Sequence, residues 1–487
     1  MENKQTKLKK IGYYGLPIVF LLMIILSVFH KTVWVDETYS LSIIKHSYTK
    51  LLQLASMDVH PPLYYMLLKL SVDIFGKILN PIYVGKLLST IPYIIMMILG
   101  FTVIKKRYGE LVSFLFNICV LGMPRMFEFA TEIRMYSWGT LFIFCTFLFA
   151  TNIRDNETLK DYIGLTIFAT LASYIHYFAC ASAIVIYTIL IVSVFLQKDY
   201  KKIGKIILSG IGVVILYLPW LFVFLKQFAH VRSGYWIQPI KWNDVVIDFL
   251  FLSRFNENWD YFSLSVLVIS IVVIGIATIL KNKNKDAVFA LDVWFFTIVL
   301  GITLSLLIKP VYVARYIIPA LGCMWLSMSI GLSQLNKKNK FRQTIILLTI
   351  VICLLCNCLY IKTENTETKK ITKTFETIEP YINENTIIVT NHTHIQRVIS
   401  YFYPNNEVVL AGDEIEDKDL TLQVYDTNLT EVTNLKTLKN HKSNILLIDA
   451  TGDLTKLFEK GGYKTEKITK GNISTNIYYN MNYVNIE

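Results

Sequence analysis

Acidic residues and a histidine lie close together in the first polar segment of the chain, directly after a long apolar run. Asp36 and Glu37 follow that run, and Asp58 and His60 precede a double proline a little further on. Acidic side chains at a membrane boundary must face water, a partner or a substrate, because exposure to lipid is costly. One of these carboxylates is a candidate general base toward a hydroxyl group. The plainer alternative is a solvated loop in which Asp36 and Asp58 cap the N-termini of helices.

Cationic and aromatic side chains follow the double proline or border later apolar runs. They are Tyr64, Arg134, His176, Lys309, Tyr312, Arg315 and Tyr316. Early acids and later cations suit transfer of a sugar from a lipid-linked phosphate, since a base activates the attacking hydroxyl and cations stabilise the departing phosphate. A second, protonated carboxyl group, as in glycosidases, is not required. Plainer alternatives stay open, namely an ion pair of Arg134 with Glu132 and interface anchoring by His176 and Arg315.

The two adjacent carboxylates cannot both point at one atom from a regular element, because neighbouring side chains diverge. We therefore expect Asp36 to be the catalytic base, with Glu37 turned toward structure, acceptor or metal. A divalent cation with oxygen-rich ligation by Asp36, Asp58 and His60 is an alternative role for the acidic segment. The mutual distances of these three side chains are not given by the sequence, so no cofactor is assigned.

The composition is that of a membrane protein with many spans. Of 487 residues, 54% are hydrophobic and only 17% are charged, and the mean hydropathy is positive. Such a chain is too apolar for a soluble protein of this size. The predicted spans are 11–29, 82–104, 110–124, 133–151, 160–177, 179–197, 204–224, 261–280, 287–308, 314–334 and 342–361.

The net charge of +12 orients the chain in the membrane and does not indicate nucleic-acid binding. Lysine and arginine are dense in every second connection between the predicted spans. These basic segments are 4–10, 105–107, 154–160, 198–205, 281–285 and 337–342. Because cytoplasmic loops carry an excess of basic residues, we expect a multi-pass plasma-membrane protein with a cytoplasmic N-terminus. The acidic segment and the residues after 361 then lie outside.

Two exterior segments before the last span have their own character. Residues 63–75 are amphipathic, begin after Pro61-Pro62 and are too short to cross a bilayer, which predicts a juxtamembrane helix in the interface. Counting this helix as a span would invert every later basic loop. Residues 225–260 mix aromatic and polar residues, which suits either an interfacial belt or a sugar-binding surface.

From residue 362 onward the composition changes to Asn, Thr, Lys and Glu. Short apolar runs predict strands, and amphipathic runs between them predict helices. The predicted strands are 386–390, 407–410 and 444–449, and the predicted helices are 394–402 and 454–460. Alternation of these elements indicates a small α/β domain.

Five short motifs follow one another in the chain. They are Trp34-x-Asp36-Glu37-x-Tyr39-Ser40, Asp58-x-His60-Pro61-Pro62-Leu63-Tyr64-Tyr65, Arg134-Met135-Tyr136-Ser137, His176-Tyr177-Phe178 and Arg315-Tyr316-Ile317-Ile318-Pro319. In this order they resemble the family 39-type glycosyltransferases. These belong to the C-type membrane glycosyltransferase fold, with the protein O-mannosyltransferases and the lipid A aminoarabinose transferases. The resemblance covers about residues 10–330.

The resemblance implies a polyprenyl-phosphate-sugar donor and an inverting transfer outside the cytoplasm. It implies that Asp36 is the base and that Arg315 and Tyr316 contact the donor phosphate. The acceptor, whether glycan, lipid or protein, is not identified. Frequent Lys, Asn and Ile hint at an AT-rich bacterial genome, for which the lipid would be undecaprenyl phosphate. We accordingly expect a mostly α-helical transmembrane glycosyltransferase domain over 1–361 and an extracytoplasmic soluble α/β domain over 362–487.

A transporter or flippase of a lipid-linked or anionic solute is the main alternative. Such proteins carry internal repeats and place charged or helix-breaking residues at mid-membrane depth. No convincing repeat is found here, and the candidate residues border the spans. A membrane-anchored sensor using only its soluble tail would leave most spans without a purpose. The sequence therefore favours the glycosyltransferase.

Overall fold

By the contacts between its residues, the chain forms two compact units. A computed structural model describes residues 4–233, 237–241, 251, 262–336, 340–411, 418–425, 429–432, 444–474 and 478–484. The helical unit comprises residues 1–29, 59–64 and 86–361, and the α/β unit comprises residues 30–58, 65–85 and 362–487. The α/β unit thus includes segments of the first polar stretch in addition to the predicted C-terminal domain. Most of the aromatic loop over 225–260 lies outside the described residues.

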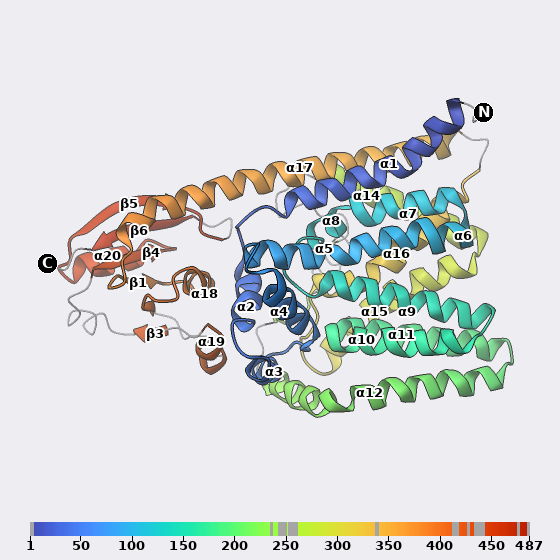
Figure 1. Ribbon diagram of the computed structural model, residues 1–487, viewed down its shortest axis with the longest axis horizontal. Coiled ribbons are helices and arrows are strands. Elements are labelled where there is room, and N and C mark those ends of the chain that lie inside the picture. Colours follow the sequence, from blue (N-terminus) through green and yellow to red (C-terminus); the bar gives the residue numbers. More distant parts are fainter. Residues whose placement is uncertain are drawn as a thin grey trace. The chain divides into compact units, whose positions relative to one another are not determined.

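The helical unit is built from long apolar helices and from shorter helical segments between them (Figure 1). They are α1 (Lys4–Ser27), α5 (Pro81–Leu99), a π-helix (Gly100–Ile104), α6 (Lys105–Tyr108), α7 (Glu110–Gly122), α8 (Pro124–Phe129), α9 (Tyr136–Asp155), α10 (Leu159–Ile175), α11 (Tyr177–Leu196), α12 (Tyr200–Ser233), α14 (Phe262–Asn282), α15 (Lys285–Leu307), η4 (Ala314–Ala320), α16 (Leu321–Ser333) and α17 (Lys340–Ile378). Every predicted span overlaps one of them. Eight helices of the described chain are long and apolar enough to cross a membrane. The fold class is confirmed, and the number of eleven spans stays a prediction.

Helices α9 and α16 form the centre of the helical unit. The apolar stretch of α9 is 83% buried and that of η4 with α16 is 94% buried, against 17% for α12. Small residues permit this close packing, because a Cβ atom on Gly139 would lie 3.2 Å from Pro319, and one on Gly322 would lie 3.2 Å from Thr140. Arg134 lies just before α9 and Arg315 lies in η4 just before α16, so both candidate arginines lie at the N-terminal ends of the two central helices.

An ionic cluster of four residues lies where α6, the C-terminal end of α9 and the start of α15 meet. Arg107 contacts Asp155 at 2.6 Å and Asp286 at 3.1 Å. Arg154 pairs with Asp286 and lies 2.9 Å from Asp155. The side chains of Arg154 and Asp286 are only 7% and 13% exposed. Buried charges are tolerated when they are paired in this way.

The C-terminal part of the α/β unit is a six-stranded sheet with the order β3-β2-β1-β4-β6-β5. Its elements are β1 (Ile387–Thr390), α18 (Thr393–Phe402), β2 (Val408–Ala411), α19 (Lys418–Tyr425), β3 (Leu429–Val432), β4 (Ile445–Asp449), α20 (Asp453–Lys460), β5 (Thr465–Gly471) and β6 (Tyr479–Val484). β1 to β4 are parallel neighbours, whereas β6 runs antiparallel to β4 and β5. The three predicted strands and two predicted helices are all present. Strand β5 was not predicted, because its sequence is largely polar, as suits a strand at the sheet edge. Strand β6 was not predicted either.

Three short helices of the α/β unit come from the first polar stretch, namely α2 (Val35–Ile43), α3 (Tyr48–Met57) and most of α4 (Leu63–Phe75). Helix α4 coincides with the predicted juxtamembrane helix. The hypothesis that Asp36 and Asp58 are N-caps is wrong, since Trp34 caps α2 and Asp58 ends α3. Asp36 instead occupies the second position of α2, where a negative charge stabilises a helix.

Candidate active site

Side chains from distant parts of the sequence converge in the helical unit. Arg134 Nη2 lies 3.3 Å from His60 Nε2. The ring of His176 lies 6.0 Å from that of His60 and 5.0 Å from that of Tyr316, measured between centroids. The positive charges of Arg134 and Arg315 both act on His176. We call His60, Arg134, His176 and Arg315 the His–Arg cluster, and it unites four predicted site residues.

His176 lies in the turn between α10 and α11 and is 2% exposed. Its Nδ1 accepts the backbone N–H of Phe178 at 3.1 Å, which caps α11. A nitrogen that accepts a hydrogen bond carries no proton, so the imidazole is neutral with its hydrogen on Nε2. His176 is therefore a hydrogen-bond donor within a cationic neighbourhood. Such burial argues against the alternative of an interface anchor.

The segment that carries Arg315 is held at both ends by hydroxyl groups. The Ser305 hydroxyl, near the end of α15, accepts the N–H groups of Val311 at 3.1 Å and Tyr312 at 3.0 Å. The Thr140 hydroxyl of α9 donates to the carbonyl of Ile318 at 3.0 Å. Arg315 thus projects from a short 3-10 helix whose approach and exit are both tied to spanning helices.

The predicted tyrosines Tyr64 and Tyr312 are buried. The Tyr64 hydroxyl lies 3.1 Å from Ser89 Oγ. Tyr312 packs its ring 5.7 Å from that of Phe178, which in turn lies 4.9 Å from Tyr316. Lys309 lies in the extended segment that precedes η4. The rings of Tyr312, Phe178 and Tyr316 thus form a group of neighbouring aromatic side chains next to the His–Arg cluster.

The acidic residues belong to the α/β unit. Glu37 Oε2 accepts the backbone N–H of Trp34 at 3.1 Å, so the buried Glu37 side chain caps its own helix. Asp36 precedes it and is half-buried. Asp58 Oδ2 accepts the hydroxyl of Tyr65 at 3.3 Å. Glu37 therefore makes a structural contact within its own helix.

Several residues that shape the site were not singled out from the sequence. The ring of Tyr136 lies 5.5 Å from that of His176, and its place in the Arg134 motif could have identified it. Ser305 and Thr140 carry no such signal, because their partners come from distant segments. Within the described ranges, no group of three or more His, Cys, Asp and Glu side chains could hold a metal ion.

Comparison with known proteins bears on the fold and the family of the chain. Residues 59–222 match the family model of dolichyl-phosphate-mannose-protein mannosyltransferases. No curated protein matches the sequence significantly. Among solved structures, ArnT from Cupriavidus metallidurans in the apo state is similar, with a TM-score of 0.68, 9% identity and 98% of both chains covered. ArnT bound to undecaprenyl phosphate gives a TM-score of 0.62, 10% identity and the same coverage.

The structural similarities span nearly the full length of the chain and include both of its units. At such low identity the solved structures establish the fold, whereas the family match covers the residues from His60 through α11. The matched segment contains three members of the His–Arg cluster. The family match and the common fold together confirm the resemblance to the C-type membrane glycosyltransferases.

Proposed function

We propose that this protein transfers a sugar, with inversion, from a polyprenyl-phosphate donor to an acceptor hydroxyl at the exterior face of the membrane. The observation that carries the proposal is the His–Arg cluster, which gathers cationic side chains and a neutral histidine donor from four distant segments. Such a site suits an anion that gains charge during a reaction. The related ArnT structure contains undecaprenyl phosphate, which supports a lipid phosphate as the anion.

The reaction is a single displacement at the anomeric carbon of the sugar. The Asp36 carboxylate removes the proton of the acceptor hydroxyl, and the acceptor oxygen forms the new bond to that carbon. The bond from the carbon to the phosphate oxygen breaks, and its electrons leave with the polyprenyl phosphate. One displacement inverts the configuration, in keeping with a single active carboxylate.

The leaving phosphate is stabilised by the cations of the helical unit. A guanidinium group binds two phosphate oxygens at once, so Arg315 and Arg134 are the proposed phosphate contacts. The Nε2–H of His176 adds a donor without adding a charge. Tyr64, Tyr312, Tyr316 and Lys309 are proposed to contact the donor, and Asp58 and His60 the substrates.

The test of the base uses purified protein in detergent, a synthetic polyprenyl-phosphate sugar and envelope extracts from cells lacking the gene. Asp36→Asn should lower transfer about 10²–10⁴-fold, as expected for loss of a general base. Glu37→Gln is the matched control, because glutamine still accepts the Trp34 N–H and keeps the cap. Near-normal turnover of folded Asp36→Asn would remove Asp36 from the mechanism.

The same experiment separates the glycosyltransferase from a flippase. A transferase releases free polyprenyl phosphate and leaves the sugar on an acceptor, whereas a flippase moves the intact donor between leaflets. Mass analysis of envelope glycans and lipids, with and without the gene, should show an accumulated donor and an unmodified acceptor. An unchanged donor pool with an altered leaflet distribution would support the flippase instead.

The exterior location rests on the basic segments, which are proposed to face the cytoplasm. A protease site and tag placed after Glu487 should then be cleaved by external protease in intact spheroplasts. Protection of the tag until lysis would invert the proposed orientation and move the chemistry to the cytoplasmic face.

A further inference from the structure

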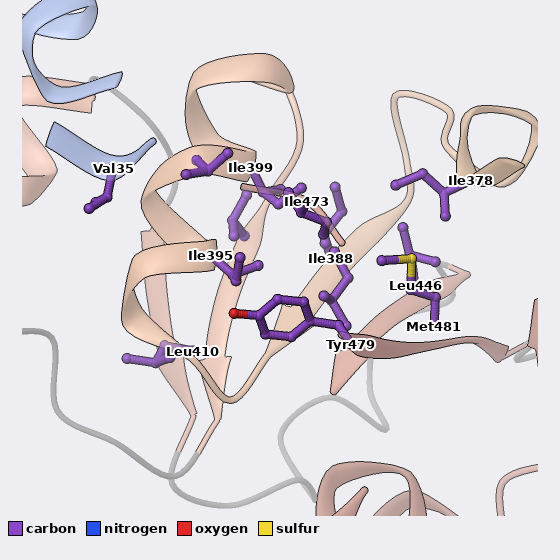
Figure 2. Close-up of a cluster of buried hydrophobic side chains, with 13 residues drawn as sticks. Val35, Ile378, Ile388, Ile395, Ile399, Leu410, Leu446, Ile473, Tyr479 and Met481 are labelled. Atoms are coloured by element: carbon purple, nitrogen blue, oxygen red, sulfur yellow. The ribbon is translucent and has the colours of Figure 1, made fainter. Parts of the chain in front are cut away.

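Helix α2, which carries the proposed base, is part of the hydrophobic core of the C-terminal domain. Val35 is 6% exposed and belongs to the same buried cluster as Ile395 and Ile399 of α18 (Figure 2). Trp34 packs against this cluster as well. The residue next to Asp36 is thus a core residue of a domain whose strands begin more than three hundred residues later in the sequence.

A chain of two hydrogen bonds connects the first turn of α2 with helix α19. Thr38 Oγ1 donates to the carbonyl of Val35 at 2.8 Å. A hydroxyl group has one hydrogen, so the 3.2 Å contact between Thr38 Oγ1 and the Tyr425 hydroxyl has Tyr425 as its donor. Thr38 is fully buried and Tyr425 is 3% exposed. The bond from Tyr425 therefore acts, through Thr38, on the turn that contains Asp36.

Neighbouring residues of α19 hold the segment that follows α2. His46 Nε2 lies 3.0 Å from the carbonyl oxygen of Val424. Lys50 Nζ donates to Gln423 Oε1 at 2.6 Å. Three consecutive residues at the end of α19 thus each contact the α2–α3 segment. Contacts from three consecutive residues restrain both the rotation and the translation of the α2–α3 segment.

Two further contacts restrain the segment at other points. The Ser474 hydroxyl donates to the carbonyl of Val33 at 3.0 Å, just before α2 begins. Lys45 Nζ lies 4.6 Å from the ring centre of Tyr401 on α18, and burial lowers the pKa of this lysine. Both ends of α2 are therefore held by residues from beyond position 400.

We propose that the C-terminal α/β domain positions the catalytic base, and that Tyr425 is a positioning residue that acts on Asp36 through Thr38. The inference rests on the proposed function, because it assumes that Asp36 removes the acceptor proton. A base must approach its hydroxyl within a few tenths of an ångström of the productive geometry, and misplacement by about 1 Å can lower a rate about 10²-fold. The domain is proposed to act on turnover through the position of Asp36.

The test compares two substitutions that each remove one hydroxyl group from the α/β unit. Tyr425→Phe keeps the ring and loses the bond to Thr38, and we expect kcat to fall about three- to tenfold with the donor KM unchanged. Tyr403→Phe is the matched control, because the Tyr403 hydroxyl bonds Glu379 at 2.7 Å, within the C-terminal segment. It removes a hydroxyl group that does not contact α2 and should keep the wild-type kcat.

A second pair tests the bond from the other side. Thr38→Ser retains the hydroxyl and should keep kcat near wild type, whereas Thr38→Val removes it and should match Tyr425→Phe. If the two groups act as a unit, the double variant Thr38→Val with Tyr425→Phe should be no slower than either single variant. Size-exclusion chromatography of each variant checks folding, and the serine–valine comparison decides the matter if Tyr425→Phe fails to fold.

Different experimental results would contradict the inference and the proposed function. An inactive Asp36→Asn together with wild-type kcat in Tyr425→Phe and Thr38→Val would overturn the positioning role alone. Equal loss of kcat in Tyr425→Phe and Tyr403→Phe would also overturn it, because the effect would then be general to the domain. An active Asp36→Asn would overturn the base and the inference built on it.

Discussion

The two ends of helix α9 carry polar clusters of different composition. At the C-terminal end, the ionic cluster joins two arginines to two aspartates, and each arginine contacts both carboxylates. At the N-terminal end, the His–Arg cluster places the positive charges of Arg134 and Arg315 near the neutral His176. Twenty helical residues, about 30 Å, separate the two ends.

The different compositions of the ionic cluster and the His–Arg cluster indicate different roles in the protein. A cluster that contains its own counter-charges is complete within the folded chain and stabilises the packing of α6, α9 and α15. The His–Arg cluster places two guanidinium groups near a neutral histidine donor, an arrangement that suits an anionic ligand. The same helix therefore supports a structural site at one end and a proposed phosphate site at the other.

The largest effect on transfer within this comparison is expected at Arg315. Arg315→Ala should lower the rate about 10²–10³-fold, as for loss of one donor to a developing oxyanion. Arg315→Lys should also lose much activity, because a point charge cannot bind two phosphate oxygens in the planar manner of a guanidinium. Transfer from a synthetic donor and donor affinity are the measurements. Full rate and affinity with lysine would make Arg315 a snorkelling anchor.

A smaller effect is expected at His176, where the cap and the proposed donor can be separated. His176→Asn keeps a side-chain oxygen that accepts the Phe178 N–H, so α11 should remain capped. It lacks the imidazole Nε2–H, and we expect kcat to fall about tenfold, the effect of one lost hydrogen bond in the transition state. Unchanged kcat in His176→Asn, with reduced stability in His176→Ala, would assign only a capping role.

The smallest effect on transfer is expected in the ionic cluster. Asp286→Asn removes the carboxylate shared by Arg107 and Arg154, and breaking such a buried pair typically costs about 3–5 kcal/mol of stability. The protein that remains folded should transfer sugar at the wild-type rate. Thermal unfolding in detergent and kcat of the folded fraction measure the two effects. A loss of kcat without loss of stability would remove the contrast between the two ends.

The elements that could be predicted from the sequence are those whose signals are local. Apolar runs predicted the spanning helices, Pro61-Pro62 predicted the start of α4, and runs such as 444–449 predicted buried strands. These signals are local because helix and strand formation depend on residues a few positions apart. The motifs also pointed to the residues of the His–Arg cluster, although each is too short to show which of them meet.

The contacts that fix the positions of these residues are seen only in the tertiary structure. Glu37 turns to the Trp34 N–H and caps α2, whereas the sequence left open whether its side chain serves structure, acceptor or metal. The contact of Thr38 with Tyr425 joins positions nearly four hundred residues apart. No local pattern records such pairings, because they arise when packed helices and a folded sheet bring distant segments together. The polar edge strand β5 was missed for the same reason, since pairing with β6 rather than composition makes it a strand.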